Sequence, residues 1–367
     1  MTVVGHAGDG AGSERKAGSM AASTRRAFRL PVLALPIAAG LLLATLVLAV
    51  TVGSSDIAVG AVLTELVSAL PGVDLDSGLS EVERTILWQW RMPRAVLGAL
   101  VGAALSLGGA TYQGVFRNPL ADPYLLGVAA GAGLGATLAI VSGVDIGWGP
   151  FHAVPVAAYV GALLAITISA VVGTGTSRSA AALLLAGIAV SAFLTAGQTY
   201  VMQRNTDILV EVYTWVLGRL GTFGWAEVLT VGPYVAVCSV IILSLRRQLD
   251  VLQLGDEEAA ALGVPVMRVR LILLATASLM TAAAVAVSGL IGFVGIVVPH
   301  LVRLLVGGSY RAILPLSAVG GAVFLVLADV GARNATSGAE LPIGVVTALL
   351  GAPFFVVVMW TRRGSLR

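Results

Sequence analysis

Apolar stretches of about twenty residues recur along almost the whole chain, and they restrict it to the folds of membrane proteins. Only 11% of the residues are charged, against about 25% in a typical soluble domain. A helix needs ~20 apolar residues to cross the hydrocarbon core, where its backbone polar groups must be satisfied internally. We therefore predict an all-α integral membrane protein with about ten transmembrane helices. The candidate spans are 31–52, 93–111, 124–142, 152–172, 181–202, 228–245, 271–289, 290–306, 312–331 and 343–360.

The distribution of basic residues predicts which side of the membrane each loop faces. An even number of spans places both termini on one side, and putting them inside leaves 16 of the 22 Lys and Arg residues in inner segments. The positive-inside rule favours that orientation. We predict a flexible cytoplasmic N-terminal tail at 1–29 and a transmembrane domain at 30–367, with both termini in the cytoplasm. The basic residues left outside are Arg84, Arg91, Arg94, Arg204, Arg219 and Arg333.

Several classes of site are excluded by single residue types. Lys16 is the only lysine, so the chain contains no G-x-x-x-x-G-K-[ST] phosphate loop and cannot bind ATP by that route. Cys238 is the only cysteine, which rules out a disulfide framework or a cysteine metal site. The basic residues cluster at the ends of apolar segments, so the net charge of +3 does not indicate nucleic-acid binding. We expect no metal and no cofactor on this chain.

The segment 91–126 combines the features that a transporter needs at its two faces. Arg91 and Arg94 begin the span at its outer end, where positive charge is scarce. The span ends in RNPLADP (117–123), where Pro119 and Pro123 interrupt the helix. Irregular backbone at membrane depth is tolerated where it lines a cavity. We predict a partner-binding surface at the outer end and a gate at the inner end.

The longest inner connection, about 246–270, predicts a short and well-bounded helix. Asp256 can cap its start, with Glu257 and Glu258 at the positive end of the helix dipole. Gly263 can close it in the left-handed conformation, and Pro265 prevents its continuation. Anionic lipid attracts basic helices, so we prefer docking to a cytoplasmic partner over resting on the bilayer.

Glycines at helical spacing predict close packing between spans. Gly98 and Gly102 are four residues apart, and Gly127, Gly131 and Gly135 form a longer series. Small residues at this spacing let helix backbones approach each other. We interpret these glycines as packing residues of a compact bundle.

The motifs together resemble the FecCD family, the permease subunits of type II ABC importers for iron-siderophores, haem and vitamin B12. The resemblance covers nearly the whole chain after residue 29. It is carried by RMPR (91–94), GVFRNPLADP (114–123), LLLAGI (183–188), LGDEEAAALGV (254–264), GFVGIVVPHLVRLL (292–305), ADVGAR (328–333) and ELPIGVVTALLGAPFF (340–355).

The resemblance implies a role for each of three groups of residues. Arg91, Arg94 and Arg333 would receive acidic residues of a substrate-binding protein. Asn118, Pro119 and Leu120 would form the cytoplasmic gate and translocation path, together with the candidates Thr176 and Ser177 of the next inner loop. The residues that would couple to the ATPase are Gly255, Asp256, Glu257, Glu258, Ala260, Leu262 and Gly263.

The resemblance also implies an assembly in the bacterial inner membrane. A second permease copy or a paralogue would complete the pathway, two cytoplasmic ATPase subunits would bind ATP and Mg, and an extracytoplasmic substrate-binding protein would dock outside. The expected cargo is an iron(III)-siderophore complex moved by alternating access, with haem or cobalamin as the alternative. The chain itself would not be an enzyme.

Two other classes remain open from the residues alone. An ion-coupled secondary transporter needs paired charges near the midplane; Asp329 is a candidate, although Arg333 four residues on makes a local ion pair the simpler interpretation. An intramembrane enzyme would need a nucleophile–base pair or a ligand set. His300 is interpreted as a structural histidine, because iron or haem sites need further ligands.

Overall fold

The computed structural model describes residues 33–53, 57–69, 72–73, 75–144, 152–176, 179–222, 224–335 and 340–362, and within these ranges it is helical with no strand. This confirms the all-α prediction. The predicted tail at 1–29 lies outside the described residues.

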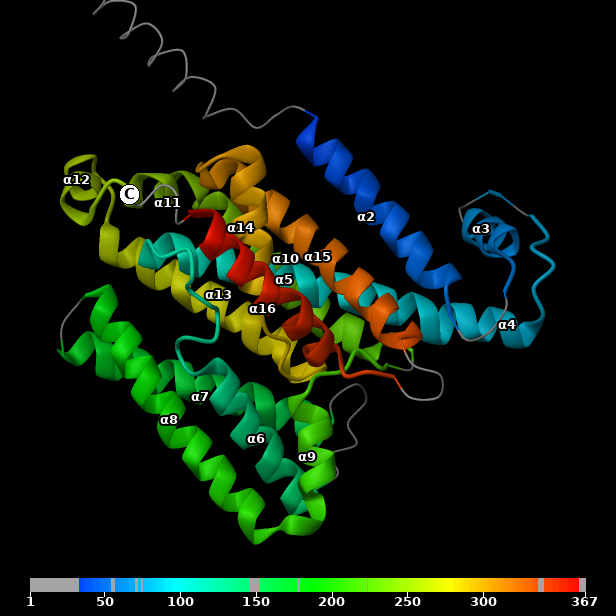
Figure 1. Cartoon of the computed structure of the whole chain (residues 1–367), viewed down its shortest axis with the longest axis horizontal. Coiled ribbons are helices and arrows are strands. Elements are labelled where there is room, and N and C mark those ends of the chain that lie inside the picture. Colours follow the sequence, from blue (N-terminus) through cyan, green and yellow to red (C-terminus); the bar gives the residue numbers. More distant parts are fainter. Residues whose placement is uncertain are drawn as a thin grey trace, which may run out of the picture.

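Ten of the described helices follow the ten predicted spans in order (Figure 1). Seven of the described helices are long and apolar enough to cross a membrane, and α6, α14 and the apolar part of α16 are shorter. The ten are α2 (Ala34–Thr51), α5 (Met92–Phe116), α6 (Val128–Ser142), α7 (Ala153–Thr176), α8 (Ala180–Arg204), α10 (Ala226–Ser244), α13 (Val266–Ser288), α14 (Val294–Val306), α15 (Tyr310–Asn334) and α16 (Ile343–Arg362).

Shorter helices lie at the two ends of the bundle. We name these ends by what they carry: the arginine end holds Arg91, Arg94 and Arg333, and the loop end holds the segment 117–127. At the arginine end are α3 (Val59–Ser68), α4 (Glu81–Thr85), the π-helix η1 (Ile86–Arg91), the 3-10 helix η2 (Thr206–Ile208) and α9 (Leu209–Val216). At the loop end are α11 (Arg246–Leu252) and α12 (Asp256–Ala261), as Figure 1 shows.

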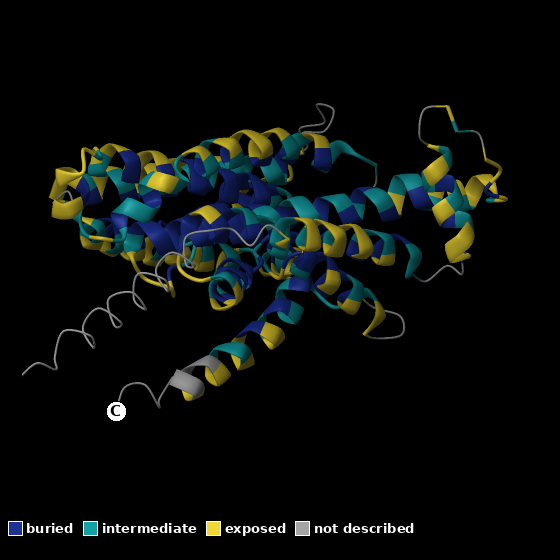
Figure 2. Cartoon of the chain, turned by 90° about the horizontal axis from the view of Figure 1, so that it is seen from above, coloured by how far each residue is buried: buried dark blue, intermediate teal, exposed yellow. Residues whose placement is uncertain are grey.

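Helix α5 is the centre of the bundle. It packs against α10, α13, α14 and α15, and most of its length is buried. In Figure 2 the buried residues run along the middle of the bundle and the exposed ones lie on its rim. A helix that is apolar and buried nearly all round is the expected core element of a membrane bundle. One central helix therefore connects the arginine end with the loop end.

The glycines do permit close helix crossings, as the sequence predicts. A Cβ on Gly102 would overlap the carbonyl oxygen of Gly321 where α5 crosses α15, and a Cβ on Gly131 would overlap that of Gly161 where α6 crosses α7. Gly127 instead has a positive φ of 86° and precedes α6 as its N-cap. Backbones this close leave no room for any side chain at these positions.

Two predicted spans begin later than their apolar runs. Helix α6 starts at Val128 rather than at 124, and α14 starts at Val294 rather than at 290. Among the non-helical residues before α14, buried Ile291 has both backbone groups satisfied, because the Tyr124 hydroxyl donates to its carbonyl at 3.0 Å and accepts from its amide at 3.3 Å. Irregular backbone of this kind is tolerated at membrane depth where protein groups satisfy it.

Candidate functional site

Arg94 is held between two carboxylates at the arginine end. Its Nη2 donates to Asp329 Oδ1 at 2.8 Å and to Glu340 Oε2 at 2.8 Å, and its Nε also donates to Asp329 at 3.1 Å. Asp329 is buried, whereas the Glu340 side chain is 56% exposed. The hydrogen bonds from Arg94 hold the pKa of the Glu340 carboxyl below its ordinary value. Arg94 therefore has one fixed partner and one partner in contact with solvent.

Asp329 has a second arginine, on its own helix. Arg333 Nε lies 3.1 Å from Asp329 Oδ2, one helical turn away. This is the local i, i+4 pair that the sequence predicts. The pair also means that Asp329 is neutralised by two guanidinium groups, which explains how a buried carboxylate is accommodated in α15.

Arg91 and Arg333 also donate hydrogen bonds to the last carbonyls of helix α2. Arg91 Nη1 donates to the carbonyls of Val50 and Thr51 at 2.9 and 3.1 Å. Arg333 Nη2 donates to the carbonyl of Ala49 at 3.1 Å. The last carbonyls of a helix have no partner within the helix and carry its negative dipole end. These two arginines thus bind the C-terminus of α2.

A cavity of about 560 Å³ opens between the three arginines. The structure therefore brings Arg333 next to Arg91 and Arg94, although about 240 residues of sequence separate it from them. Arg91 is buried, and all three arginines make contacts within the chain. The cavity lining also includes Trp90, Thr222, Glu227, Asn334 and Glu340. With three arginines and two glutamates on its wall, the cavity has an excess of positive charge.

A second cavity of about 330 Å³ adjoins the first, and Gly221 and Glu227 line both. It lies among α7, α9, α10 and α13, with His152, Glu211 and Arg219 on its wall. Within the described residues no group of three or more His, Cys, Asp or Glu side chains is placed to hold a metal ion.

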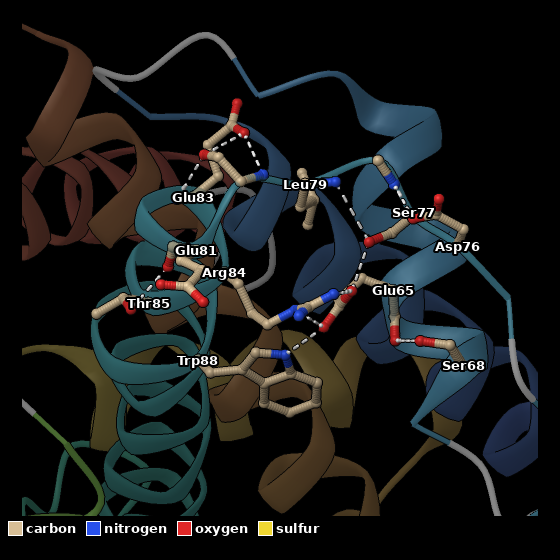
Figure 3. A network of polar contacts seen from close by, with 12 residues as sticks. Glu65, Ser68, Asp76, Ser77, Leu79, Glu81, Glu83, Arg84, Thr85 and Trp88 are labelled. Atoms are coloured by element: carbon tan, nitrogen blue, oxygen red, sulfur yellow. Dashed lines mark hydrogen bonds and ion pairs between the residues drawn. The ribbon is translucent and has the colours of Figure 1, made fainter.

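The sequence did not predict helix α3, which a network of polar contacts joins to α4 and η1 (Figure 3). The buried carboxylate of Glu65 in α3 accepts hydrogen bonds from Ser77 Oγ at 2.6 Å, Arg84 Nε at 2.9 Å and Trp88 Nε1 at 3.1 Å. The hydrogen bond from Ser77 is the main reason that the pKa of Glu65 is lowered. The network fixes α3 against α4 and η1, so the residues that lead into Arg91 are firmly placed.

The predicted gate residues form a tight turn at the loop end. Helix α5 ends at Phe116, and the Asn118 side-chain oxygen accepts a hydrogen bond from the Leu120 amide at 2.9 Å. Asn118, Pro119 and Leu120 are all exposed. Thr176 is the last residue of α7, is exposed, and donates to the carbonyl of Val172 at 2.7 Å. Ser177 lies outside the described residues.

The predicted helix of the inner connection is present as α12, with one correction at its start. Gly255 is the N-cap, with φ of 134°, and Asp256 is the first helical residue; its side chain does not cap the helix. The end is as predicted, since Gly263 has φ of 81°. The amides of Gly263 and Val264 donate to the carbonyls of Ala260 and Ala259, which forms a Schellman motif.

The reason for the correction is that Asp256 binds two arginines instead. Its Oδ1 accepts from Arg117 Nη2 and from Arg270 Nη2, both at 2.9 Å. Sequence reasoning missed Arg117 and Arg270, because nothing in their spacing pairs them with Asp256. Glu257, Glu258 and Ala260 of α12 are exposed, and so is Leu262, the C-cap of this helix.

Comparison with known proteins identifies close relatives over most of the chain. A model of the FecCD transport family matches residues 41–361. The cobalamin import system permease protein BtuC of Halobacterium salinarum is 43% identical over 291 residues, which are 78% of this chain and 77% of that protein. The Fe(3+)-citrate import system permease protein YfmE of Bacillus subtilis is 35% identical over 336 residues, 92% of this chain and 97% of that protein. A solved inward-facing conformation of a metal-chelate type ABC transporter is similar, with a TM-score of 0.76 and 31% identity over 89% of this chain and 98% of that chain.

Proposed function

This chain belongs to the FecCD transport family, and from that membership we propose that it carries an iron(III)-siderophore complex into the cytoplasm by alternating access. It is a permease of the type II ABC importer class, with the helical fold of a metal-chelate transporter. We propose that ATP and Mg are bound by two separate ATPase subunits and that this chain holds no cofactor.

One observation carries the proposal: a single buried helix, α5, connects a charged cavity at one end with an exposed gate turn and acidic helix at the other. A permease needs a docking face, a passage and a coupling face. Helix α5 would contribute to all three. The arginine end would face outward and receive a substrate-binding protein. The loop end would face the cytoplasm with both termini, and a second permease copy or a paralogue would complete the passage.

The docking role rests on ion-pair exchange at Arg94. Glu340 is the exposed partner of Arg94, so an acidic residue of a binding protein can replace it without disturbing the buried pair with Asp329. Exposed pairs of this kind orient and steer a partner more than they stabilise it. Arg91 and Arg333 would support this surface by holding α2 in place.

The names of two relatives support the proposed class of cargo. Iron(III)-citrate and cobalamin are both complexes of a metal ion with an organic ligand, and the permeases named for them match most of this chain. We propose a siderophore as the ligand. Cobalamin is the second candidate, favoured by the 43% identity to a cobalamin permease, and haem is the third.

Reconstitution tests this function directly. The permease, its ATPase and its binding protein would be placed in liposomes, and uptake of an iron(III)-siderophore, cobalamin and haem would be compared with and without ATP. We expect ATP-dependent uptake of one of these chelates, reduced by Arg94→Ala but not by Arg204→Ala, an arginine outside the cluster. Uptake that proceeds unchanged without ATP would refute an ATP-driven importer and favour ion coupling.

A further inference from the structure

The two short helices of the loop end are attached to the end of α5 rather than free of it. Gln253 Nε2 donates to the carbonyl of Gly114 at 2.9 Å. A Cβ on Gly114 would lie 2.8 Å from Leu249 Cδ1, so α11 packs directly on the α5 backbone. Asp256 adds the ion pair to Arg117 at 2.9 Å. The segment 246–261 therefore contacts the last turn of α5 at three points.

Arg117 occupies a special place in this arrangement. It is the C-cap that follows the last helical residue of α5, it adopts the left-handed conformation with φ of 51°, and it immediately precedes Asn118. An arginine is rare in this conformation, because its Cβ crowds the backbone there. The conformation turns the chain out of the helix and starts the gate turn. The ion pair to Asp256 is thus made by the first residue of the turn.

The carboxylate of Asp256 also reaches a third helix. Arg270 Nη2 donates to both of its oxygens, at 2.9 and 3.0 Å, and the Arg270 side chain is only 4% exposed on α13. One carboxylate therefore joins the end of α5, the start of α12 and the buried face of α13.

The pair between Arg117 and Asp256 is suited to positioning rather than to stability. The two side chains are 41% and 45% exposed, and exposed ion pairs contribute little to the free energy of folding. The ion pair instead sets the position of α12 relative to the gate turn, because it links the exposed acidic helix to the exposed turn across 139 residues of sequence.

We propose that Asp256 is a positioning residue that holds α12 and the gate turn 117–123 together as one unit through Arg117. Displacement of α12 by a cytoplasmic partner then displaces the gate turn by the same amount. This inference rests on the proposed function for its biological meaning, but the connection itself can be measured on the permease alone.

A distance measurement tests the connection. Spin labels would be attached to cysteines at Leu120 and Leu262, which are 58% and 64% exposed, in a full-length permease with Cys238→Ala in nanodiscs. We expect a narrow distance distribution in this parent. The distribution should broaden in Arg117→Gln and in Asp256→Asn.

Two further variants control for charge and for folding. Arg117→Lys keeps the positive charge and should restore the narrow distribution, and Arg268→Gln removes an exposed arginine of α13 two residues before Arg270 and should leave it narrow. Asp256→Asn also deprives buried Arg270 of its partner and can lower stability. Arg117→Gln leaves that buried pair intact, so it decides the result if Asp256→Asn does not fold.

Coupling is then measured in the complete complex with ATPase and binding protein. In Arg117→Gln we expect the ATPase to remain bound and active while the amount of chelate transported per ATP falls. Unchanged distance distributions in Arg117→Gln would overturn the inference. If the parent complex shows no ATP-dependent uptake, the proposed function fails, and the distance measurement still decides the connection.

Discussion

The crossing of α5 and α14 at Gly109 makes the sharpest prediction about stability. A Cβ on Gly109 would lie 2.5 Å from the carbonyl carbon of Gly295 and 2.6 Å from its Cα, and would overlap the carbonyl oxygen. Carbon atoms normally rest about 3.5–4.0 Å apart. Gly109→Ala therefore requires the backbones of α5 and α14 to move about 1 Å further from each other. This movement disturbs the hydrogen bond from Gln113 Nε2 to the Gly295 carbonyl.

The magnitude follows from two opposing effects. Overpacking of a tight interface costs about 1–3 kcal/mol, and the upper value applies because backbone rather than a flexible side chain must move. Replacing Gly by Ala within a helix stabilises the folded state by about 1 kcal/mol through the higher helix propensity of Ala. The net loss is about 2 kcal/mol, which lowers the melting temperature by about 4 °C at roughly 2 °C per kcal/mol for a large domain.

A second glycine supplies the matched control. Gly331 is in the helical part of α15, and a Cβ there meets nothing within 4 Å. Gly331→Ala keeps only the helix-propensity gain and should leave the melting temperature equal or slightly higher. Both variants would be measured in detergent by thermal unfolding of the purified permease. If Gly109→Ala melts at or above Gly331→Ala, the inference from backbone proximity is wrong.

Three further predictions concern groups at the two ends. Asp329→Asn removes the buried carboxylate shared by Arg94 and Arg333 and should cost about 3 kcal/mol, seen as a lower melting temperature. Gly263→Ala places a side chain in the left-handed region at a cost of about 1–2 kcal/mol, and should speed amide hydrogen exchange across α12. Glu65 has a lowered pKa in the folded chain, so its contribution is present above its ordinary pKa of 4.5 and is lost as the pH falls through the lowered value. The melting temperature should therefore fall less steeply with acid in Glu65→Gln than in the parent; equal slopes would contradict this.

The spans and the short inner helix could be predicted because their signals are local. An apolar run of twenty residues, or a helix closed by Gly263, is visible within one stretch of sequence. The predicted role of Asp256 as a cap was wrong for the opposite reason, since its partners Arg117 and Arg270 come from other helices. A capping residue and an ion-pair residue have the same sequence signal at a helix start.

The arginine end shows the same limit. The charge distribution selects Arg91, Arg94 and Arg333 as unusual, but it does not reveal that they lie together. The contact from Arg94 to Asp329 spans 235 residues, and the donors of Arg91 satisfy backbone carbonyls that carry no signal in the sequence. The docking role of the three arginines and the gating role of Asn118, Pro119 and Leu120 stay predictions.

The capping of α2 by two arginines has a consequence for how the protein is made. Helix α2 is mostly unburied along its length, and its buried residues, Thr45, Ala49 and Val50, lie toward the end where the arginines bind. Arg91 follows Val50 by 41 residues, but Arg333 follows Val52 by 281. At about 5–20 residues per second, a ribosome needs roughly 15–60 s to synthesise the second arginine after α2. During this interval the C-terminus of α2 can be capped by Arg91 but not yet by Arg333.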